Sequence, residues 1–207
     1  MKKTFSVLMI GFAALASAQI SFSARANLLF PTGSASWENI KNTAVSAYDE
    51  KGKNNVGFNF GLSAKIATPT SFFVMPEVYY TTFKNEFTDP ETNTTLEAKS
   101  NRIDVPVLLG YDVWGDTIGI FAGPVASYNL SSEDTFNDFR ENAKSNFTVG
   151  YQFGAQVMIK SLIMNARYEG SFSKDEREFI NNNVSNGYVV RYDSRPSLFS
   201  VGLGYKF

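Results

Sequence analysis

Residues 55–67 read NVGFNFGLSAKIA, and this stretch decides the fold. From Val56 to Ile66 every second residue is apolar, and the residues between them are polar or small. A helix would break this order within a turn or two, whereas the side chains of a β-strand alternate between two faces. The stretch therefore predicts a strand that is buried on one face only.

The same alternation predicts seven further strands along the chain. They cover about residues 20–30, 71–84, 101–113, 117–130, 146–160, 162–173 and 195–207. Three connections are tight (TPT, WGD and KS), and the other four are long and polar. Eight antiparallel strands with short turns at one end and long loops at the other are typical of a bacterial outer-membrane barrel.

The composition of the two strand faces separates a membrane barrel from a soluble, lipocalin-like barrel. In residues 146–160 one face consists of Thr148, Gly150, Gln152, Gly154 and Gln156. A surface in water would normally carry more charge, whereas small and amide side chains suit a crowded lumen. We therefore predict an all-β fold, an eight-stranded antiparallel transmembrane up-and-down β-barrel in the bacterial outer membrane, with outer-membrane lipids around it.

The first residues predict a cleavable signal peptide. Lys2 and Lys3 form a positive start, FSVLMIGFAALA is an apolar run, and ASA at 16–18 is a small-residue cleavage site. A membrane anchor is the alternative, but the run is too short to span a bilayer. We expect residues 1–18 to be the signal peptide and residues 19–207 to be the barrel domain.

Two residue types that support much enzyme chemistry are absent. The chain contains no Cys and no His, which excludes disulfides, thiolate chemistry and triads that depend on histidine. Without Lys2 and Lys3, 17 basic and 20 acidic residues remain, so no basic surface for nucleic acid is expected. We predict that the protein is not an enzyme and needs no cofactor, metal ion or nucleic-acid partner.

The end of the chain continues the alternation to its last residue. Tyr205 and Phe207 are on the apolar face of the last predicted strand, SVGLGYKF, which must pair with the first strand to close the barrel. A terminal Phe on such a strand resembles the signal recognised by the barrel-assembly machinery. We therefore predict that machinery as a partner.

Four segments carry a family resemblance. FFVMPEVYY, RIDVPVLLGYDV, IFAGPVASYNL and SVGLGYKF resemble the PorT-like outer-membrane β-barrel family, with a Pro-Glu strand, a Pro strand, a Gly-Pro strand and an aromatic end. The resemblance implies an eight-stranded outer-membrane barrel. It implies little chemistry, and the role in secretion attached to some members is not carried over.

Three prolines lie inside predicted neighbouring strands. Pro76, Pro106 and Pro124 cannot donate a backbone hydrogen bond, and a closed barrel has no edge where this loss is harmless. We expect them to lie close together on one wall, at a local bulge or break in strand pairing. The functional alternative is a lateral opening for an apolar substrate.

Charged residues fall on the inward face of the strands. The predicted lumen network consists of Arg25, Glu77, Arg102, Asp104, Arg167 and Glu169, with Lys65 and Asp112 on the same face. Buried charges are costly unless paired, so an ion-pair network that fills the lumen is the main interpretation. A constriction that selects small solutes and a catalytic pair of Glu77 with Glu169 are the alternatives.

These observations lead to two functional hypotheses. The first is a small outer-membrane barrel with a plugged polar lumen, whose long loops give it a structural, adhesive or interaction role, with a possible extracellular partner. The alternative is a transport protein that passes small or apolar molecules through the lumen or through a gap in the wall.

Overall fold

A closed barrel is the main body of the molecule in a computed structural model. The structure describes residues 19–32, 37–40, 53–54, 56–88, 95–130, 139–143, 147–172, 176–181, 188–193 and 197–207. The predicted signal peptide at 1–18 lies outside these residues. In the described part of the chain, no helix is long and apolar enough to cross a membrane.

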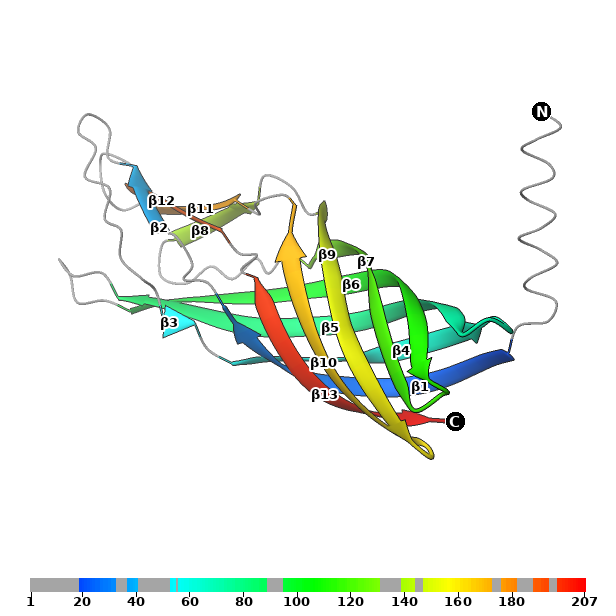
Figure 1. Ribbon diagram of the computed structural model, residues 1–207. Helices are drawn as coiled ribbons and strands as arrows, with labels where there is room; N and C mark the ends of the chain where they lie inside the picture. The colour runs from blue at the N-terminus through cyan, green and yellow to red at the C-terminus, as the bar shows by residue number, and fades with distance from the viewer. Residues whose placement is uncertain are drawn as a thin grey trace, which may run out of the picture.

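Eight antiparallel strands form the barrel, in agreement with the predicted fold class (Figure 1). They are β1 (Gln19–Pro31), β4 (Gly57–Ala67), β5 (Phe72–Thr88), β6 (Thr95–Trp114), β7 (Ile118–Asn129), β9 (Phe147–Ile159), β10 (Leu162–Ser171) and β13 (Leu198–Lys206). Around the wall their order is β5, β4, β1, β13, β10, β9, β7 and β6, and β6 pairs with β5 again. No barrel strand is therefore left with a free edge.

The paired residues define how far the strands shift around the barrel. Starting at Gln19, the successive partners are Ala67, Phe73, Gly110, Phe121, Gly154, Arg167, Ser200 and finally Leu29. The path returns to β1 ten residues beyond its start, at 29 instead of 19. For eight strands, this shift tilts each strand by about 40° from the barrel axis.

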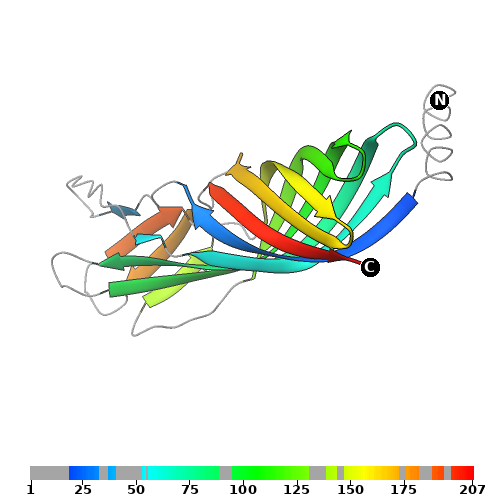
Figure 2. The same ribbon diagram turned by 60° about the horizontal axis from the view of Figure 1, so that its bottom comes forward.

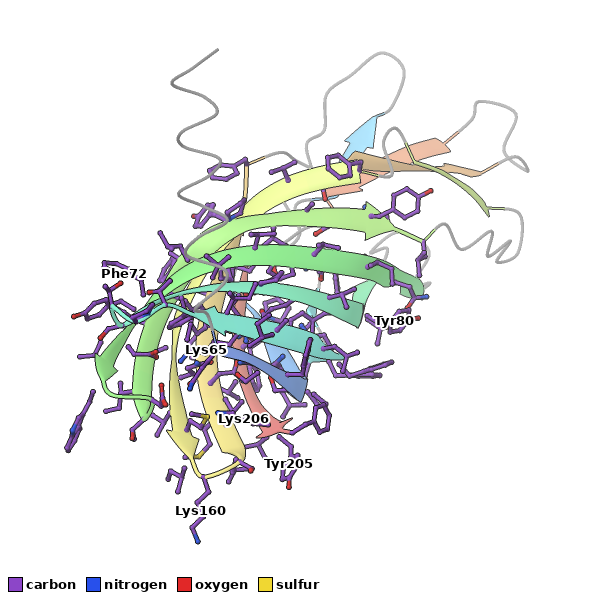
Figure 3. The ribbon with its side chains drawn as sticks, turned by 90° about the vertical axis from the view of Figure 1, so that its right-hand side faces the viewer. Lys65, Phe72, Tyr80, Lys160, Tyr205 and Lys206 are labelled. Atoms are coloured by element: carbon purple, nitrogen blue, oxygen red, sulfur yellow. The ribbon has the colours of Figure 1, made fainter. Side chains whose placement is uncertain are left out.

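The alternation along the strands separates a lipid-facing surface from a lumen. In β4, Phe60 and Leu62 are 54% and 58% exposed, whereas the polar Ser63 that follows Leu62 is 2% exposed. Figure 3 shows side chains of the outer surface, among them Tyr205, projecting away from the barrel. The predicted direction of the two faces is confirmed, because large apolar side chains surround the barrel and polar ones fill it.

The narrow lumen requires small residues beside large ones. Gly110 of β6 is paired with Phe73 of β5, and a Cβ atom on Gly110 would lie 2.0 Å from the Phe73 ring. Only a residue without a side chain fits there. Phe73 can therefore turn inward and is fully buried.

Five short strands lie in the long connections, where the sequence predicted only loops. They are β2 (Trp37–Ile40), β3 (Lys53–Asn54), β8 (Phe139–Ala143), β11 (Glu176–Asn181) and β12 (Tyr188–Asp193). Four of them form a second sheet in the order β2, β12, β11 and β8, which lies beyond the long-loop end of the barrel (Figures 1 and 2). Three separate connections thus meet in one structure.

The last barrel strand is held by backbone bonds up to the final residue. The N–H of Phe207 donates to the carbonyl of Phe22 at 3.0 Å, and the N–H of Lys206 donates to Ser161 at 2.8 Å. The side chain of Phe207 is 74% exposed on the lipid-facing surface. Phe207 therefore contributes one backbone hydrogen bond and little burial within the protein.

We predict that deletion of Phe207 impairs assembly more than it impairs the stability of the folded barrel. The lost backbone bond is worth only about 1 kcal/mol, whereas an assembly signal would be removed entirely. The measurement compares the yield in the outer membrane with urea unfolding of the refolded protein. Equal membrane yields for the truncated and full-length chains would contradict the prediction.

Candidate functional site

Among the residues whose side chains the structure describes, four basic and four acidic side chains lie in the lumen. They are Arg25, Lys65, Arg102 and Arg167, and Glu77, Asp104, Asp112 and Glu169. Each belongs to a strand of the barrel wall, and all except Lys65 are less than one-tenth exposed. Because such burial is costly for an unpaired charge, the arrangement of these side chains determines what the lumen does.

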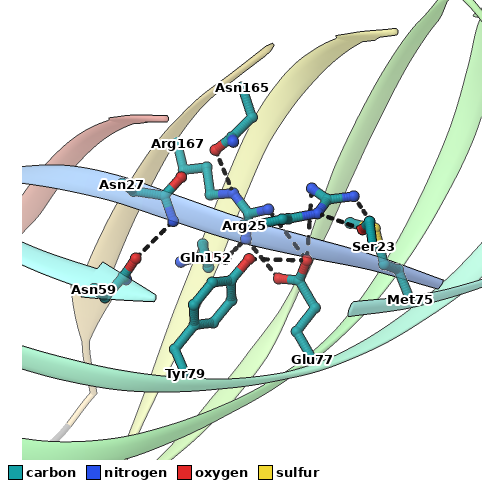
Figure 4. Close-up of polar contacts among 10 residues, drawn as sticks. All are labelled: Ser23, Arg25, Asn27, Asn59, Met75, Glu77, Tyr79, Gln152, Asn165 and Arg167. Atoms are coloured by element: carbon teal, nitrogen blue, oxygen red, sulfur yellow. Dashed lines mark hydrogen bonds and ion pairs between the residues drawn. The ribbon is translucent and has the colours of Figure 1, made fainter. Parts of the chain in front are cut away.

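Glu77 and Arg167 connect opposite walls of the barrel. Arg167 donates to the two carboxylate oxygens of Glu77 at 2.5 and 3.1 Å (Figure 4). Glu77 is in β5 and Arg167 is in β10, and three strands separate β5 from β10 in either direction around the wall. This pair therefore crosses the full width of the lumen.

Further polar side chains fix this pair in place. The hydroxyl of Tyr79 donates to Glu77 at 3.2 Å, and Arg167 also donates to Gln152 at 3.0 Å and to Asn165 at 2.8 Å. Buried charges that are both paired and hydrogen-bonded keep a single geometry. The middle of the lumen is therefore occupied by a bonded cross-link.

A second arginine shares the same carboxylate. Arg25 of β1 lies 3.6 Å from Glu77, which is longer than the Arg167 contacts. Arg25 also donates to Ser23 at 3.2 Å and approaches the sulfur of Met75 at 3.3 Å. This middle cluster therefore combines two guanidinium groups with one carboxylate and has one excess positive charge.

The next cluster lies closer to the long-loop end and contains two carboxylates. Arg102 contacts Asp104 at 2.9 Å and Glu169 at 2.7 Å. Thr81 donates to Asp104 at 2.6 Å, and Ser127 donates to it as well. Arg102 is therefore bound by two carboxylates, whereas Glu77 in the middle cluster is contacted by two guanidinium groups.

The two glutamates considered as a catalytic pair do not meet. Glu77 is bound by Arg25 and Arg167, whereas Glu169 is bound by Arg102. Sequence reasoning placed Glu169 at the height of Glu77, but the structure places it in the other cluster. In the described part of the chain, no group of three or more acidic residues could hold a metal ion.

The short-turn end of the lumen is apolar. Phe73, Met75, Leu108 and Phe121 form a buried cluster there. Beside it, Lys65 donates to both oxygens of Asp112 at 2.8 and 2.7 Å and lies 4.4 Å from the centre of the Phe73 ring. Sequence reasoning missed this apolar layer, although Phe73, Met75 and Phe121 fall on the inward parity of their strands.

The three strand prolines interrupt pairing without shifting the register. The residue pairs that are missing opposite the prolines are Ala64–Pro76, Glu77–Pro106 and Val107–Pro124. The paired residues on either side of each gap keep the same register. The prolines also lie close together, since Pro76 pairs with Val107 and Pro106 with Val125. The gaps are therefore breaks in pairing, and the bulge considered as an alternative does not occur at them.

The comparisons with known proteins agree with this architecture. The model of a family described as an outer membrane protein beta-barrel domain matches residues 17–176. No curated protein sequence matches the chain closely enough to count as a relative. The narrower resemblance to PorT-like barrels stays a prediction.

Solved structures with the same fold share little sequence with this chain. OprG from Pseudomonas aeruginosa is 16% identical, with a TM-score of 0.61 over 92% of this chain and 97% of OprG. AlkL, solved in DMPC lipid bilayers, is 12% identical, with a TM-score of 0.50 over 91% of this chain and 90% of AlkL. Neisserial surface protein A is 17% identical, with a TM-score of 0.44 over 91% of this chain and 99% of that protein.

The family match covers more than half of the chain and includes seven of the eight wall strands, from β1 to β10. At such low identities, the likeness to solved structures shows the fold alone. The lipid-facing surface and the family agree on the location, which is the bacterial outer membrane. The chain therefore belongs to the outer membrane protein β-barrel domain family.

Proposed function

We propose that this protein is a closed barrel that acts through its extracellular end, in an adhesive or other interaction role. The observation that carries the proposal is the ion pair of Glu77 with Arg167, which joins opposite walls across the lumen. Above it lies the Arg102 cluster, and below it lies the apolar layer around Phe73. A hydrated ion would have to break all three layers to pass.

The second sheet supports a role at the cell surface. It combines strands from the connections before β4, after β7 and after β10. The β5–β6 hairpin also continues beyond the barrel, because Thr88 and Thr95 are still paired. Long loops that share a sheet present a defined backbone surface, which an external partner can recognise.

We predict little or no steady conductance for the purified protein in planar bilayers. The bonded layers fill the narrow lumen of an eight-stranded barrel, so ions find no continuous water path. A large and stable single-channel conductance of the unmodified protein would overturn the closed-barrel proposal. Transport of small molecules through the lumen would then become the favoured function.

Two variants extend this measurement. Glu77→Ala leaves two buried arginines without their carboxylate, so we expect the free energy of unfolding to fall by about 3–5 kcal/mol and a leak to appear. Asp116→Asn is the matched control, because Asp116 is an exposed carboxylate in a short turn. Asp116→Asn should change neither the free energy of unfolding nor the conductance measurably.

We predict that adhesion depends on the second sheet and that assembly does not. In the test variant, a two-residue Asn-Gly turn replaces residues 173–197, which removes β11 and β12. The barrel should still close through the pairing of β10 with β13. Cell aggregation and surface adhesion are measured at matched surface levels, and the expected result is their loss.

The control for this experiment shortens a different loop. An Asn-Gly turn in place of residues 89–94 alters the β5–β6 hairpin and leaves the second sheet intact. This variant should adhere like the full chain. Full adhesion of the 173–197 variant would contradict the interaction proposal.

The second candidate function is passage of apolar molecules through the wall. It is favoured by the gaps in strand pairing beside Pro76, Pro106 and Pro124, because fewer hydrogen bonds hold neighbouring strands together there. Such a path would lead from the lumen into the membrane without a continuous pore. It is compatible with the low ion conductance that we predict.

We predict that restoring the missing donors would slow such passage. The triple variant Pro76→Val, Pro106→Val, Pro124→Val supplies three backbone N–H groups, and valine suits a strand. Uptake of n-octane into vesicles that contain the protein should fall to the level of protein-free vesicles. Equal uptake with the triple variant and the unmodified protein would remove this candidate.

A further inference from the structure

The outer surface of the barrel has a hollow near the short-turn end. It measures about 510 Å³ and is lined by residues of β1, β4 and β5 and by Phe207 at the end of the chain. Its lining includes Phe22, Leu62, Ala64, Pro76, Val78 and Phe207. The small Ala64 and the flat Pro76 ring lie between taller side chains, which creates the depression.

One backbone carbonyl at this hollow lacks its usual partner. In an antiparallel ladder, paired residues exchange both N–H···O=C bonds. Pro76 has no N–H, and the Ala64–Pro76 rung is missing. The carbonyl of Ala64 is therefore without its cross-strand donor, in a wall that faces hydrocarbon, where an unsatisfied polar group is costly.

The carbonyls left by the other two prolines are placed differently. Val107 lies opposite Pro124 and is not part of the hollow. The backbone of Gly123 in the next strand comes close to its oxygen, since a Cβ atom on Gly123 would lie 2.1 Å from it. Glu77 also lines the hollow, but the donor missing opposite Pro106 is on the β6 side of Glu77, away from β4. Ala64 is therefore the lining residue whose missing donor lies between the two strands under the hollow.

We propose that this hollow binds an apolar molecule that carries one hydroxyl group. The hydroxyl donates to the carbonyl of Ala64, and the hydrocarbon part lies against Phe22, Leu62 and Val78. A charged group is disfavoured because the exposed side chains that line the hollow, among them Phe22, Leu62 and Val78, are apolar. The occupant therefore comes from the membrane phase.

This binding site is independent of both candidate functions. It lies on the outside of the wall, so it requires neither an open lumen nor the extracellular sheet. It also requires no movement of a molecule across the wall. Binding and passage can therefore be measured separately, and either can fail while the other holds.

The first test compares two probes that differ in one donor. Dodecan-1-ol and dodecyl methyl ether are titrated into the full-length protein in lipid nanodiscs, and the carbonyl resonance of Ala64 is followed by NMR. The alcohol should bind about tenfold more tightly and shift that resonance, because only the alcohol donates a hydrogen bond. Equal affinity of the two probes would overturn the proposal.

The second test supplies the missing donor from the protein itself. Pro76→Val adds an N–H opposite Ala64, so the roughly tenfold preference for the alcohol should disappear. Pro124→Val is the matched control, because it restores a donor opposite Val107, which does not border the hollow. It should keep the preference. An undiminished preference in Pro76→Val would overturn the assignment to the Ala64 carbonyl.

Discussion

Backbone polar groups in the membrane need hydrogen-bond partners, and apart from the carbonyls opposite the three strand prolines the barrel provides them through strand pairing. A sheet of eight strands satisfies this need only by closing, which the pairing of β1 with β13 and of β5 with β6 accomplishes. Closure with a shift of ten residues sets the width of the lumen. The side chains that fit inside follow from that width.

A narrow lumen makes each buried charge depend on its neighbours. Glu77 is bound by two arginines, and Arg102 by two carboxylates. The first cluster holds two guanidinium groups around one carboxylate, and the second holds two carboxylates around one guanidinium group. The apolar layer around Phe73 then separates these clusters from the short-turn end. The interior therefore resembles the core of a soluble protein more closely than a channel.

Much of the barrel could be predicted because period-two alternation is a local property. It identified all eight wall strands to within a few residues at most ends and assigned Arg25, Glu77 and Arg167 to the lumen. The strand β6 was underestimated, since its upper part from Thr95 to Asn101 has only Leu96 and Ala98 as apolar residues and so alternates weakly. The strands of the second sheet were missed because they are only four to six residues long, too short for alternation to identify them.

The partners within the lumen could not be read from the sequence. They depend on register and tilt, which bring β10 opposite β5, and neither quantity is encoded in one strand. Glu169 is only two residues from Arg167, yet it binds Arg102 in another cluster. The apolar layer was missed because inward Phe and Met residues look like lipid-facing ones when each strand is considered alone.

The pair of Glu77 and Arg167 also has a consequence for the order of events during assembly. The two residues are 90 positions apart in the chain, so strands near the beginning and near the end must both be in place before the pair forms. In an open sheet, before the barrel closes, Glu77 and Arg167 cannot reach each other. A slip of one residue in β5 would turn Glu77 toward lipid. The ion pair therefore stabilises only the closed barrel with the correct register. Closure of the barrel is the step at which a barrel with the correct register is distinguished from one with a shifted register.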